Sequence, residues 1–178
     1  MTEHDICHQP YTSAMPIQPR SASSAEEQLS IIDALIALPF PEQEGQSKTQ
    51  HGRGGPGYHI AVLRESRDFW DAPDPETITA AEEEMEAGLT ALVTVLAGRW
   101  GSPTVVDLWP YLGLDNPDYP DIEEAPEPLD SLCNLAGSMQ MWQVPSTGRW
   151  LGLTIGQVDR EFPLEILAAV GEASTLPK

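Results

Sequence analysis

The stretch SMQMWQVPSTGRWLGLTIG, residues 138–156, decides the fold. Two runs that suit β-strands, 138–144 and 149–156, flank a short segment rich in turn-forming residues, which is typical of a β-hairpin. Neighbouring strands joined by short connections favour an α+β domain with a mostly antiparallel sheet. We therefore expect an α+β fold whose sheet has about four strands and which has three helices, in the order α-β-α-β-β-β-α.

The hairpin loop fixes which side chains share a face of the sheet. A three-residue loop over 146–148, with Gly148 in the left-handed conformation, predicts that Trp142 pairs with Gly152. In this register Trp142 and Trp150 lie on the same face, whereas a two-residue loop would change the faces. Exposed tryptophans of this kind anchor protein interfaces. The alternative, which we favour, is that a helix covers them and both faces of the sheet are core.

Two helices are expected before the hairpin. Ser24 and Glu27 have the spacing of a capping box, and a helix over 24–38 would end at the prolines that follow. A second helix over 74–100 begins at Asp74-Pro75 and ends at Gly101, with apolar residues at three- and four-residue steps. Its first turns hold several glutamates, which the positive end of the helix dipole stabilises.

The other segments complete the expected order. Strands are predicted over 58–64 and 104–109, and a closing helix after Asp159, where apolar residues recur at helical spacing up to Gly171. Residues 42–57 and 110–130 are expected to form a flexible Gly-rich loop and an acidic Pro-rich loop. Residues 1–23 are predicted to be a disordered N-terminal arm, and residues 24–178 a single domain.

The net charge of −19 is concentrated in one part of the chain. Residues 68–130 hold 16 acidic and one basic side chain. Such a field repels nucleic acid and anionic membranes, so direct binding to either is not expected. A cationic protein surface would be attracted instead, although acidity can also serve solubility alone. The chain has no apolar run long enough to span a bilayer, which predicts a cytoplasmic protein.

No motif for catalysis or for a cofactor is present in the sequence. The glycine-rich segment 51–57 precedes a strand, whereas phosphate-binding loops follow one. His4, Cys7 and His8 are suitable zinc ligands but lack a fourth partner at a recognised spacing, and the acids between 115 and 124 lack the alternation of a calcium loop. We therefore predict no metal site, no cofactor and no catalytic residue.

The preferred function is a non-catalytic module that docks a cationic protein partner through the acidic segment 68–130, with neutralisation of that partner as one use of the contact. Immunity proteins and DNA-mimicking inhibitors use the same charge complementarity, but the comparison concerns charge alone, because no family motif is identifiable. The predicted partner-binding residues are Asp115, Asp118, Asp121, Glu123, Glu124, Glu127, Asp130, Trp142 and Trp150.

Two alternatives remain open at this point. The chain could be a scaffold or assembly component that binds through the aromatic hairpin face, with acidity serving solubility. It could also be a hydrolase or metal enzyme, in which His59 and Asp107 form an acid–base pair if their strands are neighbours. The oligomeric state does not follow from the sequence.

Overall fold

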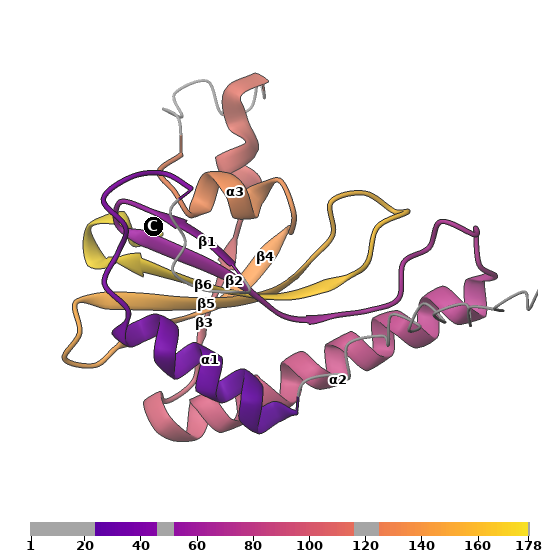
Figure 1. Ribbon diagram of the computed structural model, residues 1–178, viewed down its shortest axis with the longest axis horizontal. Helices are drawn as coiled ribbons and strands as arrows, with labels where there is room; N and C mark the ends of the chain where they lie inside the picture. The colour runs from indigo at the N-terminus through magenta and orange to yellow at the C-terminus, as the bar shows by residue number, and fades with distance from the viewer. Residues whose placement is uncertain (1–23, 46–51, 116–124, 178) are drawn as a thin grey trace, which may run out of the picture.

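The computed structural model describes residues 24–45, 52–115 and 125–177, and its core is one antiparallel sheet (Figure 1). The six strands run in the order β1-β2-β6-β5-β4-β3. They span β1 Gly52–Gly55, β2 Tyr58–Glu65, β3 Thr104–Asp107, β4 Ser138–Val144, β5 Arg149–Gly156 and β6 Glu165–Glu172. The helices are α1 Ala25–Ala37, α2 Pro75–Trp100 and α3 Leu129–Cys133, with short 3-10 helices η1 Trp109–Asp115 and η2 Ala173–Thr175. The predicted α+β class is confirmed, but the sheet has six strands and not about four.

Both long helices begin where their capping residues predict. The side chain of Ser24 accepts a hydrogen bond from the backbone N–H of Glu27, whose carboxylate accepts one from the Ser24 N–H in return. Asp74 caps α2 by accepting from the backbone N–H of Thr77 at 2.8 Å. These bonds satisfy N–H groups that have no partner inside a helix, so the helix starts are determined locally.

The hairpin of β4 and β5 is confirmed, but its predicted register is wrong. Val144 pairs with Arg149 and Trp142 with Leu151, so the loop has four residues, 145–148. Gly148 is left-handed as expected (φ 65°), and Ser146 is left-handed as well (φ 63°). The additional loop residue shifts the pairing by one, and the two tryptophans lie on opposite faces as a result.

The predicted closing helix is wrong, because residues 165–172 form the strand β6. This strand lies between β2 and β5, and the six residues from Ile166 to Gly171 are all buried. A strand that is covered on both faces needs no polar alternation, so its apolar run resembles part of a buried helix. The side chains of its two alanines are small and Gly171 has none, so large side chains of the neighbouring strands can pack over this strand.

Two predicted loops contain ordered structure. The Gly-rich segment includes β1, which pairs with β2 from Gly52 to Gly55. The acidic Pro-rich segment includes most of η1 and the start of α3. The predicted arm over 1–23 and the acids between 116 and 124 lie outside the described residues.

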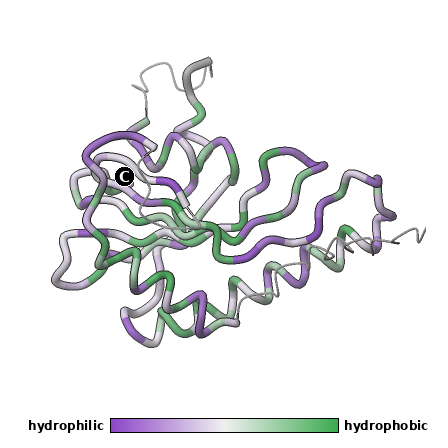
Figure 2. The backbone as a smooth tube through the Cα atoms, viewed as in Figure 1, coloured by the Kyte–Doolittle hydropathy of each residue, from purple (hydrophilic) through white to green (hydrophobic). Residues whose placement is uncertain are grey.

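Helices cover both faces of the sheet, as Figure 1 shows. On one face, Ile32 and Leu35 of α1 and Leu92 of α2 pack with Leu151 of β5 and its neighbours. On the other face, α3 and η1 cover a second cluster, which includes Trp150. In Figure 2 the central strands, which these helices cover, are mostly coloured as hydrophobic residues.

Candidate functional site

The tryptophans predicted to form a binding face are buried in separate cores. Trp142 is 3% exposed, packs among the residues below α1 and α2, and donates from its indole N–H to the carbonyl of Gly101 at 2.9 Å. Trp150 is fully buried on the opposite face. The two indoles therefore do not form a common surface, and the alternative in which both faces are core describes the sheet correctly.

Two of the predicted acidic residues are part of the local structure around α3. Glu127 is half-buried, and its carboxylate accepts hydrogen bonds from the backbone N–H and the hydroxyl of Ser131. Asp130 is also half-buried, and its carbonyl accepts from Asn134. Asp115 is the last residue of η1, and the other predicted acids, Asp118, Asp121, Glu123 and Glu124, fall outside the described residues.

Most of the exposed acidic residues that the structure describes gather at a different place, which we call the acidic end. It consists of the loop 66–74, the first turns of α2 and the loop 157–164, which extend beyond the sheet on the right of Figure 1. Backbone hydrogen bonds join the two loops: the N–H of Phe69 donates to the carbonyl of Glu161 at 3.0 Å, and that of Ser66 to the carbonyl of Leu164 at 2.8 Å. Segments about 90 residues apart in the sequence thus form one surface.

Eleven exposed carboxylates lie within 65–86 and 157–164, against two exposed arginines, Arg67 and Arg160. A third arginine, Arg64, is half-buried and forms an ion pair with Glu84. The exposed acids are Glu65, Asp68, Asp71, Asp74, Glu76, Glu82, Glu83, Glu84, Glu86, Asp159 and Glu161. The potential of this end of the molecule is therefore strongly negative.

An exposed aromatic pair lies between the two loops of the acidic end. The rings of Trp70 and Phe162 are in edge-to-face contact, with their centroids 5.0 Å apart. Trp70 is 57% exposed and Phe162 39% exposed, and Val158 of the same loop is also exposed. Large aromatic side chains that remain in contact with water are typical anchors of protein interfaces.

Two carboxylates lie opposite each other at this end of the sheet. Glu65 of β2 and Glu165 of β6 are directly opposite in the antiparallel ladder. Burial raises the pKa of the Glu165 carboxyl, and the neighbouring Glu65 raises it further. Directly opposed like charges destabilise a sheet, so this pair costs the protein stability in the absence of a ligand.

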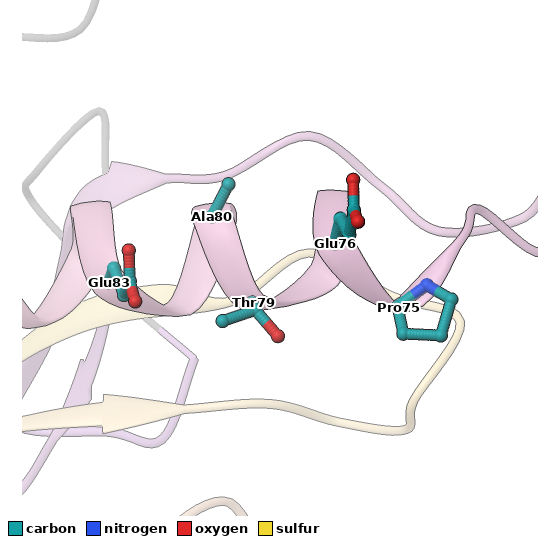
Figure 3. Close-up of a pocket in the computed structure, with 5 residues that line it drawn as sticks. All are labelled: Pro75, Glu76, Thr79, Ala80 and Glu83. Atoms are coloured by element: carbon teal, nitrogen blue, oxygen red, sulfur yellow. The ribbon is translucent and has the colours of Figure 1, made fainter.

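Two open hollows lie on the surface of the part of the chain that the structure describes. One, of about 300 Å³, is lined by Pro75, Glu76, Thr79, Ala80 and Glu83, all from α2 (Figure 3). Another, of about 360 Å³, lies between α2 and strands β4 and β5, near Gln140 and Thr154. Neither is lined by histidine or cysteine; the titratable side chains that line them are Glu76 and Glu83 in the first and Glu86 in the second.

The proposed acid–base pair of His59 and Asp107 does not form. Their strands, β2 and β3, are separated in the sheet by β6, β5 and β4, which corresponds to about 19 Å at the usual strand spacing. His59 is buried under the end of α1, and Asp107 is exposed, with its carboxylate accepting from the backbone N–H of Trp109. In the described ranges, no three His, Cys, Asp or Glu side chains come together as they would around a metal ion.

The acidic segment 68–130 includes most of the loop 66–74 and the first turns of α2, but none of the predicted binding residues lies in the acidic end, and the loop 157–164 was not predicted to belong to it. The motif DFWDAPD at 68–74 sets Trp70 among three aspartates, and DREFP at 159–163 places Phe162 among acids in the same way. An aromatic residue inside an acidic, proline-containing loop is the signal that could have found both. The second loop was missed because the segment was assigned to the start of a helix.

Comparisons with protein-family models, with curated proteins and with solved structures found no match to the chain. Among the helices that the structure describes, none combines the length and the apolar character that a bilayer span requires.

Proposed function

We propose that this chain is a non-catalytic protein-binding module whose acidic end docks on a cationic surface of another protein. The observation that carries the proposal is the exposed Trp70–Phe162 pair, which belongs to two loops that also carry exposed carboxylates. The aromatic rings supply apolar area that a partner can bury, and the carboxylates attract and orient a basic surface. A neutralising, inhibitor-like role is one use of such a module.

The opposed Glu65 and Glu165 support the same proposal. A cation from the partner placed near this pair would relieve the repulsion between the two carboxylates. The left-handed backbone of Ala72 (φ 45°), two residues after Trp70, is a second local cost in the same loop. Costs of this kind cluster at binding sites, where function and stability conflict.

The test uses the full chain as bait for proteins from its own cells, at low and at high salt. We expect a basic partner that is retained at low salt and released as the salt screens the charges. A bait carrying Asp71→Lys and Glu161→Lys should lose it. A matched control, Glu26→Lys with Glu42→Lys, reverses the same number of exposed charges outside the acidic end and should retain it.

Two results would overturn the proposal. The first is that no basic protein is recovered at either salt concentration. The second is that both double variants retain the partner equally well, because binding would then depend on net charge or on another surface.

A further inference from the structure

The two edges of the sheet differ in how they are protected. At the β1 edge, the backbone N–H of Gly45 donates to the carbonyl of Gly54, and the strand carries Arg53. At the β3 edge, the ladder to β4 supplies every backbone partner of Thr104–Asp107 found among the described residues. Edge strands with unpaired N–H and C=O groups pair readily with another strand unless a charge or a cover prevents it.

The side chain at the centre of this open edge is apolar and exposed. Val105 is 65% exposed, whereas its neighbour Val106 is buried in the core on the other face of the sheet. Beyond the end of the strand, Trp109 is also 65% exposed. The β3 edge thus combines a free backbone with apolar side chains that have no cover within the described residues.

We propose that the β3 edge is an interface between two copies of this chain, in which β3 pairs antiparallel with β3 of the partner subunit. A two-fold axis perpendicular to the sheet would pass midway between Val105 and Val105 of the partner subunit, and the sheets of the two copies would become continuous. The surface is self-complementary in this arrangement, as an interface with two-fold symmetry requires.

The register follows from the faces of the strand. Side chains of one face must stay together in the joined sheet, so one residue of the strand pairs with the same residue of the partner subunit. Centred on Val105, the pairing sets Val105 opposite Val105 of the partner subunit and Thr104 opposite Val106 of the partner subunit. Each Asp107 then lies opposite a proline, Pro103, and the two carboxylates are at opposite ends of the interface.

The charge of the edge favours a second copy over the cationic partner of the acidic end. Asp107 is the one charged residue of β3, and its carboxylate already accepts from the backbone N–H of Trp109 at 3.0 Å. A strand of this composition offers little attraction to a basic surface. Each copy carries a net charge of −19, however, so repulsion between the copies opposes pairing at low salt.

This repulsion gives the dimer a characteristic salt dependence. Added salt screens it, so association of two copies should strengthen with salt, whereas docking of a cationic partner should weaken. The failure of one proposal is therefore distinguishable from the failure of the other. Because a four-residue strand buries a small area, we expect a weak dimer, with a dissociation constant of about 10 μM to 1 mM.

The test is sedimentation velocity of the full chain from about 10 μM to about 1 mM, in low salt and in about 0.5 M NaCl. We expect a dimer that grows with concentration and with salt. Val105→Lys and Val105→Glu place like charges at the axis, so each should weaken self-association at least about tenfold. An equimolar mixture of the two variants should recover association, because opposite charges then face each other.

Val95→Lys is the matched control, since Val95 is an exposed valine of α2 (42%) and the substitution changes the net charge equally. It should associate as the wild type does, and circular dichroism should show that all variants are folded. Three results would overturn the proposal: a monomer at all concentrations and salts, a V105K variant that associates like the wild type, or a mixture of V105K and V105E that stays monomeric.

Discussion

The guanidinium of Arg149, on β5, donates a hydrogen bond of 2.6 Å to the carbonyl of Leu38, the C-cap of α1. It also donates to the carbonyl of Ile36 at 2.8 Å, and it lies 3.9 Å from the centre of the Phe40 ring. The last carbonyls of a helix have no partner within it, and the helix dipole favours a cation beside them. Arg149 therefore fastens α1 to the sheet through the backbone.

Replacing Arg149 should loosen this attachment. Arg149→Met keeps the aliphatic stem but leaves two half-buried carbonyls without their charged donor, so we expect the free energy of unfolding to fall by about 2–3 kcal/mol. Equilibrium denaturation in urea measures it. Arg160→Met, at an exposed arginine, should change it by less than about 0.5 kcal/mol. Equal effects of the two substitutions would contradict the role given to Arg149.

His59 lies beside Arg149 under the same helix end. The ring is fully buried, its Nε2 is 3.3 Å from the carbonyl of Leu38, and its Nδ1 has no hydrogen-bond partner among the described residues. Burial lowers the pKa of His59, and the charge of Arg149 lowers it further. The hydrogen bond with the Leu38 carbonyl raises the pKa, but by less than burial lowers it. The imidazole of the folded protein therefore stays neutral to a lower pH than that of the unfolded chain, whose pKa is 6.5.

This difference makes stability depend on pH. Below pH 6.5 the unfolded chain takes up a proton at His59 that the folded chain does not, so stability falls as the pH falls from 6.5 to the folded pKa. The contribution is at most about 1.4 kcal/mol per pH unit. In His59→Phe, denaturation curves between about pH 6.5 and pH 5 should depend less on pH than those of the wild type. Parallel pH profiles would contradict this prediction.

The elements that could be predicted from sequence are those whose signals are local. The capping box of Ser24 and Glu27, and the Asp74-Pro75 start of α2, involve residues within one turn of each other. Gly148 belongs to the same class, because its left-handed backbone is decided by the loop itself. In each case the sequence neighbours that make the structure are the ones visible in the pattern.

The wrong predictions concern segments whose structure is decided by tertiary contacts. β6 is a strand because β2 and β5 pair with it on both sides, and neither pairing is visible in the sequence of residues 165–172. Trp142 and Trp150 were predicted on one face and lie on opposite faces, because the hairpin loop has one additional residue. The acidic end depends on hydrogen bonds between residues 66–69 and 161–164, and no local pattern predicts those.

Trp150 packs over Gly171, so a larger residue at this position should destabilise the protein. The two residues are paired across β5 and β6, and a Cβ at Gly171 would lie 2.5 Å from the indole Nε1. Gly171→Ala should therefore lower the free energy of unfolding by about 1–3 kcal/mol. Gly98→Ala is the control: its Cβ meets nothing within 4 Å inside α2, so we expect a gain of up to about 1 kcal/mol. Thermal unfolding of both variants checks the opposite signs.

The opposed carboxylates predict a substitution that stabilises the free protein. Burial and the charge of Glu65 raise the pKa of Glu165 above its ordinary 4.5, so the charged form costs stability above the folded pKa. Glu165→Gln removes that charge, and we expect the free energy of unfolding near pH 7 to rise by about 0.5–1 kcal/mol. The gain should disappear below pH 4.5, where the Glu165 carboxyl becomes protonated in the folded and in the unfolded chain alike.

The same substitution separates a structural cost from a binding role. If the acidic end docks a cationic partner, Glu165→Gln should stabilise the chain yet weaken that docking, a combination expected where a site is kept at the expense of stability. Glu161→Gln, at an exposed acid in the neighbouring loop, is the control and should leave the free energy of unfolding unchanged within about 0.5 kcal/mol. A loss of stability in Glu165→Gln would mean that this carboxylate makes a favourable interaction, and the pair would then give no support to the proposed site.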